Sequence, residues 1–410
     1  MHDDSLGRYA RLALTVGLNL QKGQPLLINA STQSLPLVRA LAEQAYELGA
    51  GSVTPLLHDP AVVRLELEKL ADEYLDQVPT WFIEARVQAT LDGAAIVSLA
   101  DEDPTHLRGI DPDRLQRRQR ALMRSRRRYL ELVGAHAVNW LIIGSASPGW
   151  AAAVFPDLPA AEASERLWQA IFSTVRLDSA NPEAAWRDHL TRLETRAAAL
   201  NRARFDALHF TGPGTDLRVG LAKRHVWKSA GATSRNGVRF VPNLPTEEVF
   251  TAPDPQRVTG VVRSTRPLNL SGTLVEGITA RFEEGRAVEV AAEHGGEALT
   301  GLLASDEGAR RLGEVALVET PNPVYDAGFL FQNTLYDENA ASHVAFGRAY
   351  PDTLGSRAGS DGELASAGGN VSMIHVDWMI GSPDVDVDGL KSGGQRIPLL
   401  RAGRWVWDGK

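Results

Sequence analysis

The sequence contains no cysteine at any of its 410 positions. Disulfide bonds, zinc held by thiolates and a thiol nucleophile are therefore excluded as sources of stability or catalysis. Any metal ion that this chain binds must be held by oxygen atoms and imidazole nitrogens. The side chains of Asp, Glu, His and Tyr consequently become the candidates for a functional site.

The chain also lacks an excess of positive charge and a long apolar run. Its formal net charge is -8, which gives no general attraction for nucleic acid or for anionic membranes. No apolar stretch approaches the ~20 residues that cross a bilayer, and the N-terminal stretch MHDDSLGRYARLAL lacks the basic segment of a signal peptide. We therefore expect a cytoplasmic protein with neither nucleic acid nor a membrane as partner.

Three common catalytic signatures are missing as well. The chain has no H-E-x-x-H, no G-x-x-x-x-G-K-[ST] and no G-x-S-x-G, so the usual zincin, P-loop and serine-hydrolase sites are not predicted. The segment GPGTDLRVG contains Gly212 and Gly214 but lacks the third spaced glycine of a dinucleotide site. This segment is interpreted as a turn.

The length and the order of the apolar segments indicate two domains. Residues 24–57 contain a strand (QPLLINAS), an amphipathic helix and a second strand (SVTPLL), and apolar runs at 93–99 and 137–144 alternate with helical stretches. This pattern predicts an N-terminal α/β domain with a mostly parallel sheet over residues 1–205. Short strands follow, among them 269–275, and predict a β-rich α+β domain over residues 206–410.

A basic segment, RRQRALMRSRRRYLEL, interrupts the first of these domains. Arg117, Arg120, Arg124 and Arg128 recur there at helical spacing. Because the whole chain is acidic and no stacking aromatic residues are interleaved, the favoured interpretation is a solvated or interface helix face. Steering of an anion or substrate is the alternative.

The segment VSMIHVDWMIGS, residues 371–382, predicts a strand with two chemically different faces. Side chains alternate along a strand, so His375 and Asp377 share one face while Val376 and Trp378 share the apolar face. An imidazole and a carboxylate two residues apart can bind a metal ion together. The alternative for this pair is a histidine that is oriented by a hydrogen-bonded carboxylate.

The segment LYDENAASHVAFGRAYPD predicts a loop that enters a helix, capped by Asp337 or Asn339 and ended by a proline. In such a helix Asn339, His343 and Tyr350 lie on one face, and Glu338 lies at the helix start. His343 is then a candidate ligand with the Tyr350 phenol nearby. Ordinary packing of the two rings, and interaction of Glu338 with the helix dipole, are the alternatives.

Two further segments place carboxylates among apolar residues. Glu314 lies in LGEVALVE, and Glu247 and Glu248 lie in LPTEEVFTAP. Neighbours in an extended chain point in opposite directions, so only one of Glu247 and Glu248 is expected to face a common site. A surface position on a strand is the alternative for each of these glutamates.

These segments together resemble the thermophilic aminopeptidase family, that of aminopeptidases T and S. PTEEVFTAPDPQRVTG, RRLGEVALVE, LYDENAASHVAFGRAY and IHVDWMIGS correspond to its metal-site blocks in the same order, and GPGTDLRVGL and LNLQKGQPLLINA are similar to it. The resemblance extends over most of the chain and shows no departure at the ligands. It implies Tyr350 as the catalytic phenol and the following metal ligands: Glu248, Glu314, Glu338, His343, His375 and Asp377.

The resemblance further implies an N-terminal α/β domain, a C-terminal metal domain and a homodimer whose active sites face an enclosed cavity. Four carboxylates and two imidazoles exceed a tetrahedral structural site and suit two divalent ions of zinc, cobalt or manganese type with an activated water. We therefore expect a metal-dependent aminopeptidase acting on peptide substrates. Tyr350 would stabilise the oxyanion, and Glu247, beside the ligand Glu248, is a candidate general base.

Two alternative functions follow from the same residues. The first is a two-metal hydrolase of another amide or of a phosphoester, for which the arginine-rich helix would have to supply cationic clamps at the metal site. The second is a catalytically silent peptide-binding dimer. A complete ligand set together with Tyr350 disfavours the second alternative, since a structural metal site needs no open position for water.

Overall fold

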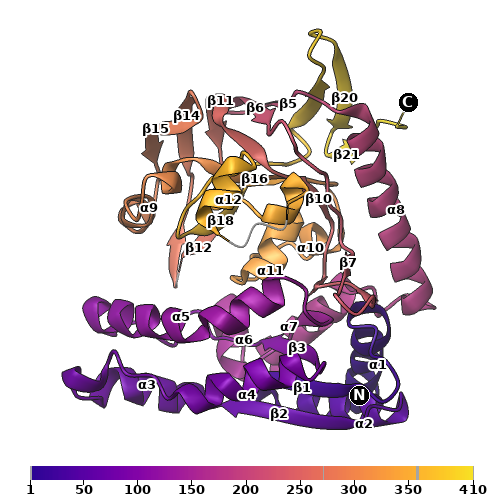
Figure 1. Ribbon diagram of the computed structural model, residues 1–410, viewed down its shortest axis with the longest axis vertical. Coiled ribbons are helices and arrows are strands. Elements are labelled where there is room, and N and C mark those ends of the chain that lie inside the picture. The colour runs from indigo at the N-terminus through magenta and orange to yellow at the C-terminus, as the bar shows by residue number, and fades with distance from the viewer. Residues whose placement is uncertain (1, 271, 357–359, 410) are drawn as a thin grey trace. The chain divides into compact units, whose positions relative to one another are not determined.

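The computed structural model describes residues 2–270, 272–356 and 360–409 (Figure 1). The chain divides into two compact units, Met1–Arg187 with Gly231–Pro245 and Asp188–Ala230 with Thr246–Lys410. The expected boundary at 205 lies inside the second unit. The reason is that helix α8 (Pro182–Ala203) runs through the division without a linker, and that residues 231–245 return to the first unit.

The first unit is built on a five-stranded parallel sheet of order β2-β1-β3-β4-β9. The predicted opening is confirmed by β1 (Pro25–Ser31), α2 (Leu35–Glu47) and β2 (Ser52–His58). The later apolar runs form β3 (Ala95–Ala100) and β4 (Trp140–Gly144), and the returning segment adds β9 (Asn243–Leu244). Apolar side chains of β1, β3 and β4, such as Ile28, Val97 and Leu141, are fully buried.

Helices connect these strands, as a parallel sheet requires. Their starts carry the expected signals: Asp59 caps α3 (Pro60–Lys69) and Asp111 caps α5 (Pro112–Gly134), each followed by proline at the first helical position. The remaining helices and short strands of this unit are α1 (His2–Leu12), α3 (Pro60–Lys69), α4 (Thr80–Leu91), α5 (Pro112–Gly134), α6 (Pro148–Val154), α7 (Ala160–Thr174), β7 (Ala232–Thr233) and β8 (Arg239–Phe240).

The arginine-rich segment is helix α5, and its first turns are held by carboxylates within the same unit. Arg114 pairs with Asp72, Arg117 with Asp76 at 2.8 Å, and Arg118 with Glu66. These ion pairs join α5 to α3 and to the residues that follow it. They support the interpretation of this helix as a solvated, structural face.

The second unit contains an eight-stranded antiparallel sheet of order β15-β14-β11-β6-β5-β19-β20-β21. The turn predicted for the segment GPGTDLRVG is present: Pro213 and Gly214 connect β5 (Ala207–Gly212) to β6 (Thr215–Leu221). The expected strand at 269–275 is instead a hairpin of β12 (Leu268–Leu270) and β13 (Thr273–Val275), and Ser271 lies outside the described residues. The other strands are β11 (Pro253–Arg263), β14 (Thr279–Glu283), β15 (Arg286–Ala291), β19 (Asp386–Leu390), β20 (Arg396–Arg401) and β21 (Arg404–Trp405).

A second, four-stranded antiparallel sheet of order β10-β16-β17-β18 lies in the same unit. Its strands are β10 (Glu248–Thr251), β16 (Leu312–Val318), β17 (His343–Gly347) and β18 (His375–Met379). Short helices accompany it: α9 (Gly296–Leu303), α10 (Pro323–Asp326), α11 (Thr334–Asp337) and α12 (Asp361–Ser366). The predicted fold class, an α/β unit with a parallel sheet followed by a β-rich α+β unit, is confirmed.

The apolar side of this small sheet is packed by aromatic residues. Phe346 of β17 stacks on Trp378 of β18 with ring centroids 5.3 Å apart, and on Phe282 of β14 at 6.0 Å. All three side chains are essentially inaccessible to solvent. The opposite side of the sheet is therefore the one left for polar residues. Among the described residues, no helix is both long enough and apolar enough to cross a membrane.

Candidate metal centre

The polar side of the four-stranded sheet is organised by strand register. Glu314 of β16 and Asp377 of β18 both lie opposite Ala345 of β17, one on each side. Directly opposed residues of antiparallel strands point to the same face, so two carboxylates flank a single methyl group. A larger residue than Ala345 would fill the space between them.

Two histidines and a third carboxylate share this face. His343 and His375 lie two residues from Ala345 and Asp377 on their own strands, which places them on the same side. Glu248 of β10 lies opposite Val318 of β16, four residues from Glu314 and therefore again on that side. The predicted alternation of His375 and Asp377 on a strand is confirmed.

A bulge between β16 and β17 sets this register. The pairing slips by one residue between Leu312 and Glu314, so that Glu314 lies opposite Ala345. Gly313, at the slip, has room for no side chain, because a Cβ atom there would lie 2.3 Å from the carbonyl oxygens of Gly347 and Arg348. A glycine at this position is therefore required by the approach of the two strands.

The ligand atoms converge on two points. The Nε2 atom of His343 lies 3.1 Å from Oε2 of Glu248, 3.5 Å from Oε1 of Glu314 and 3.9 Å from Oδ1 of Asp377. The Nε2 atom of His375 lies 3.3 Å from Oδ2 of Asp377 and 3.9 Å from Oε2 of Glu314. Glu314 and Asp377 thus each direct one oxygen toward each imidazole.

The orientation of both imidazoles is fixed by backbone carbonyls. Nδ1 of His343 lies 3.1 Å from the carbonyl oxygen of Ala341, and Nδ1 of His375 lies 2.7 Å from that of Arg348. A carbonyl oxygen accepts only, so each Nδ1 carries the proton and each Nε2 of the neutral ring presents its lone pair to the carboxylates. Metal-binding histidines are held in this way by their second nitrogen.

Two buried oxygens of the cluster have no hydrogen-bond donor. Oε2 of Glu248 and Oδ1 of Asp377 are inaccessible to solvent and, when the imidazole of His343 is neutral, accept no hydrogen bond from any residue that the structure describes. An orphaned buried carboxylate oxygen is costly unless a cation compensates it. Among the described residues, no lysine or arginine forms an ion pair with Glu248, Glu314 or Asp377. The described residues form two three-residue ligand groups, in each of which the candidate ligand atoms lie within 4.8 Å of one another: Glu248, Glu314 and His343, and Glu314, His375 and Asp377. Such sets of carboxylate oxygens and imidazole nitrogens fit divalent metal ions.

The charges of the cluster perturb its protonation in the absence of metal. Burial, together with the charges of Asp377 and Glu248, raises the pKa of Glu314 to about 7 despite its hydrogen bond with His343. Burial by itself would lower the pKa of His375, but the carboxylates of Asp377 and Glu314 outweigh it and raise that pKa to about 10. Protons therefore occupy the metal-free cluster where cations would otherwise bind.

Glu338 is close to the cluster but belongs to neither three-residue ligand group. It lines a small pocket together with Asp377, Leu268, Met379 and other residues. Burial, followed by the charge of Asp377, raises the pKa of Glu338 well above its usual value. Glu338 directly follows α11, and the negative charges of the neighbouring cluster disfavour the ionised form of its carboxylate.

The helix expected to carry His343 and Tyr350 does not form, and this prediction was wrong. Helix α11 ends at Asp337, a single 3-10 turn spans Glu338–Ala340, and His343–Gly347 is the buried strand β17. All five residues of β17 are buried because both faces of this central strand are covered, so no alternating pattern marks it in the sequence. Strand pairing consequently brings His343 next to the other candidate ligands.

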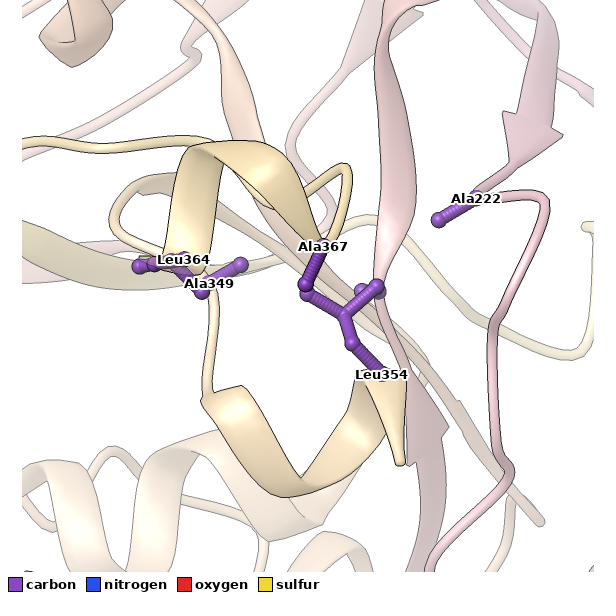
Figure 2. Packing of buried hydrophobic residues seen from close by; sticks show 6 residues of the cluster. Ala222, Ala349, Leu354, Leu364 and Ala367 are labelled. Atoms are coloured by element: carbon purple, nitrogen blue, oxygen red, sulfur yellow. The ribbon is translucent and has the colours of Figure 1, made fainter. Parts of the chain in front are cut away.

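Tyr350 lies beside the cluster, but it does not share a helix face with His343 as predicted. Its ring lies 4.6 Å from the ring of His375, and the residue is 47% exposed. The segment around it is anchored by the apolar cluster in Figure 2, to which Ala349 and Leu354 contribute on either side of Tyr350. The remaining members of that cluster are Ala222, Ala252, Leu364 and Ala367. An exposed phenol thus projects from a firmly packed segment.

Glu247 and Glu248 point in different directions, as expected for neighbours in an extended chain. Glu247 belongs to neither ligand group, and its Oε2 lies 3.5 Å from Nε2 of the buried His189 of α8. The backbone N–H of Glu247 donates to Oδ1 of Asn339 at 2.7 Å. The sequence pattern did not predict this hydrogen bond of Asn339, because it placed Asn339 in a helix that does not form.

Comparison with known proteins agrees with this geometry. A family model described as Thermophilic metalloprotease (M29) matches residues 2–405. The chain is 51% identical to aminopeptidase T of Thermus aquaticus over 403 residues and 41% identical to aminopeptidase AmpS of Bacillus subtilis over 403 residues, in each case with 98% of both chains covered. The predicted resemblance is confirmed.

Solved structures extend the comparison. Wild-type AmpT from Thermus thermophilus superposes with a TM-score of 0.94 at 49% identity, covering 99% of this chain and 100% of that one. A 2,5-dihydroxypyridine dioxygenase from Pseudomonas putida superposes with a TM-score of 0.54 at 12% identity, covering 100% of this chain and 99% of that one. The second likeness concerns the fold alone.

Proposed function

The chain belongs to the thermophilic metalloprotease family, and from this premise we propose that it is a metal-dependent aminopeptidase that releases N-terminal residues from peptides. The site would use two divalent ions of zinc, cobalt or manganese type. The side chains that would hold them are Glu248, Glu314, Glu338, His343, His375 and Asp377.

The observation that carries the two-ion proposal is the position of Glu314. Its two carboxylate oxygens lie 3.5 Å from Nε2 of His343 and 3.9 Å from Nε2 of His375. Glu314 is also the residue common to both ligand groups, with Glu248 and His343 on one side and His375 and Asp377 on the other. A carboxylate shared between two imidazole-containing groups suits a pair of ions better than one ion.

Divalent ions in this position supply Lewis acidity and activate water near neutral pH. The protein's own contribution begins with Tyr350, whose exposed phenol beside His375 is placed to donate a hydrogen bond to the oxyanion that develops on the substrate carbonyl. Because Ala349 and Leu354 are fully buried, the donor is held before the substrate arrives. A preorganised donor costs no reorganisation during the reaction.

A proton must also move from water to the leaving amine. Glu247 remains our proposed proton acceptor, since it adjoins the proposed ligand Glu248 and is buried beside His189, whose Nε2 lies 3.5 Å from Oε2 of Glu247. Glu314 is less suited to this role, because a carboxylate that neutralises two ions is a weak base.

Exopeptidase selectivity requires a group that recognises the free α-amino terminus. Glu338 lines a small pocket and belongs to neither three-residue ligand group, so a carboxylate oxygen of Glu338 that no ion uses can accept hydrogen bonds from an α-ammonium group. An N-acetylated substrate has no such charge. The proposal therefore predicts discrimination between free and blocked N-termini.

The alternative substrates receive less support. A phosphoester hydrolase usually adds cationic clamps to its metals. Arg114, Arg117 and Arg118 of α5 are engaged with acidic residues of the first unit, and the described part of the chain offers no cation paired with the ligand carboxylates. A silent peptide-binding protein would have no need of the exposed Tyr350 phenol beside the ligands.

We also propose that the protein acts as a homodimer. Large apolar side chains of the first unit are exposed on α3, α4 and α5, and Trp81 is 72% accessible. The others on these helices are Val62, Leu65, Leu91, Met123 and Leu130. Exposed apolar groups of this size are typical of protein interfaces, and a second copy of the chain would cover them.

The proposed activity is tested with aminoacyl para-nitroanilides and their N-acetylated counterparts. Each is assayed after chelation and after re-addition of zinc, cobalt or manganese. Hydrolysis of the free-amine substrates only when metal is present supports the proposal. Equal hydrolysis of the acetylated substrates, or no hydrolysis with any metal, contradicts it.

A further inference from the structure

Asn339 joins two segments that carry proposed metal ligands. It follows Glu338 directly in the sequence, and its side chain accepts a hydrogen bond from the backbone N–H of Glu247, which directly precedes Glu248. The Oδ1 to N distance is 2.7 Å although the residues are 92 positions apart. One short hydrogen bond therefore joins the segment that carries Glu248 to the segment that carries Glu338.

The other end of the amide is fixed as well. Nδ2 of Asn339 donates to the carbonyl oxygen of Leu335 at 3.0 Å, one turn earlier in α11. The residue is 1% exposed, so water does not compete for either bond. A backbone N–H needs an acceptor and a backbone carbonyl needs a donor, and the side-chain amide of Asn339 supplies both from one planar group.

The backbone of Asn339 is held by a second amide. Nδ2 of Asn322 lies 3.1 Å from the carbonyl oxygen of Asn339 and 3.2 Å from that of Ala340. The turn after Glu338 is thus fixed through both its side chain and its backbone. In contrast, no hydrogen bond within the described ranges of the chain holds the carboxylate of Glu338, and its placement depends on this turn.

We propose that Asn339 is a positioning residue that sets the separation of Glu338 and Glu248 and thereby the geometry of the metal site. This inference rests on the proposed function, because it assigns both glutamates as ligands. Without the amide, the Glu247 N–H is left buried and unsatisfied, and the two segments lose their direct link. Outer residues that orient metal ligands typically change metal affinity by ~10- to 100-fold when they are replaced.

The test compares Asn339→Ala with Asn333→Ala. Asn333 caps α11 by accepting the N–H of Leu335 at 3.2 Å, so its replacement weakens the same helix without touching Glu247. Binding of cobalt to the metal-free proteins is titrated by calorimetry, and the visible spectrum of bound cobalt reports ligand geometry. Thermal unfolding shows that both variants are folded.

Asn339→Ala is expected to weaken binding of at least one ion by about tenfold or more and to alter the cobalt spectrum. Asn333→Ala is expected to bind cobalt within about twofold of the wild-type protein. Wild-type affinity and spectrum in Asn339→Ala, or equal weakening in both variants, would overturn the inference. A wild-type protein that binds no cobalt would instead contradict the proposed function.

Discussion

The buried carboxylate of Glu314 makes the stability of the metal-free protein depend on pH. Its pKa is raised from 4.5 to about 7, so the folded state keeps a proton that the unfolded state loses. Between pH 4.5 and 7 the folded protein therefore binds more protons, and the free energy of unfolding falls as pH rises. At 1.36 kcal/mol per pKa unit, the loss is roughly 3 kcal/mol and is complete above pH 7.

The substitution Glu314→Gln tests this reasoning, since an amide resembles the protonated carboxyl group in shape and charge. At pH 5 the two metal-free proteins should unfold at similar temperatures. At pH 8 the variant should be the more stable, and because 1 kcal/mol shifts the midpoint of a domain of this size by roughly 2–4 °C, a difference of roughly 6–12 °C is expected. His375 adds a further loss in both proteins between pH 6.5 and about 10, as its raised pKa is passed.

The assay is calorimetric unfolding in a chelator from pH 5 to 9, repeated with saturating zinc. Zinc should reverse the order of stability at pH 8, because the wild-type site gains ~4.1 kcal/mol when free metal is ~1,000 times its dissociation constant, which exceeds the loss of roughly 3 kcal/mol, whereas the variant would lack one carboxylate charge of the site. The reasoning is refuted if the metal-free wild type and Glu314→Gln show the same midpoint at pH 5 and at pH 8.

Three other outcomes are expected. Tyr350→Phe should lower kcat by roughly 10²- to 10³-fold, because it removes the proposed donor to the oxyanion. Metal content and thermal midpoint should stay unchanged, because the exposed phenol makes no hydrogen bond within the described residues. Tyr74→Phe, at 48% exposure in the first unit, is the control and should retain full turnover. Glu247→Gln should keep both metals yet lower kcat by roughly 10²-fold or more, and unchanged turnover would remove Glu247 as proton acceptor. Trp81→Glu should halve the mass measured by light scattering, because it places a charge in the proposed dimer interface. Val261→Glu, at an exposed strand position of the second unit, should leave the mass unchanged. A monomeric wild-type protein would contradict the proposed dimer.

Local sequence patterns were sufficient where one face of an element is buried and the other is not. The βαβ opening was predicted because its apolar residues follow the periods of a strand and a helix. The pair His375 and Asp377 was placed on one face of a strand for the same reason, and β18 has that geometry. The opposite orientations of Glu247 and Glu248 also follow from backbone alternation alone.

The pattern failed at residues 338–350, where burial is uniform. His343–Gly347 is covered on both faces between β16 and β18, so its sequence shows neither the two-residue period of a strand nor the ~3.6-residue period of a helix. The capping residues before it and the proline after it suggested a helix where the structure has a strand. The family resemblance still identified His343 and Tyr350 as site residues. It could not indicate that a strand and a packed turn, instead of one helix face, bring them to the others.

The sequence by itself determined the chemistry available to this protein. With no cysteine, and with histidines and carboxylates in apolar segments, it restricted a metal site to oxygen and imidazole ligands. Only the tertiary structure decided how these candidate ligands combine: the register that puts Ala345 between Glu314 and Asp377, the bulge at Gly313, and the contact of Asn339 with Glu247. Such features join residues from distant segments, and their geometry is set by strand pairing and burial, which local sequence does not encode.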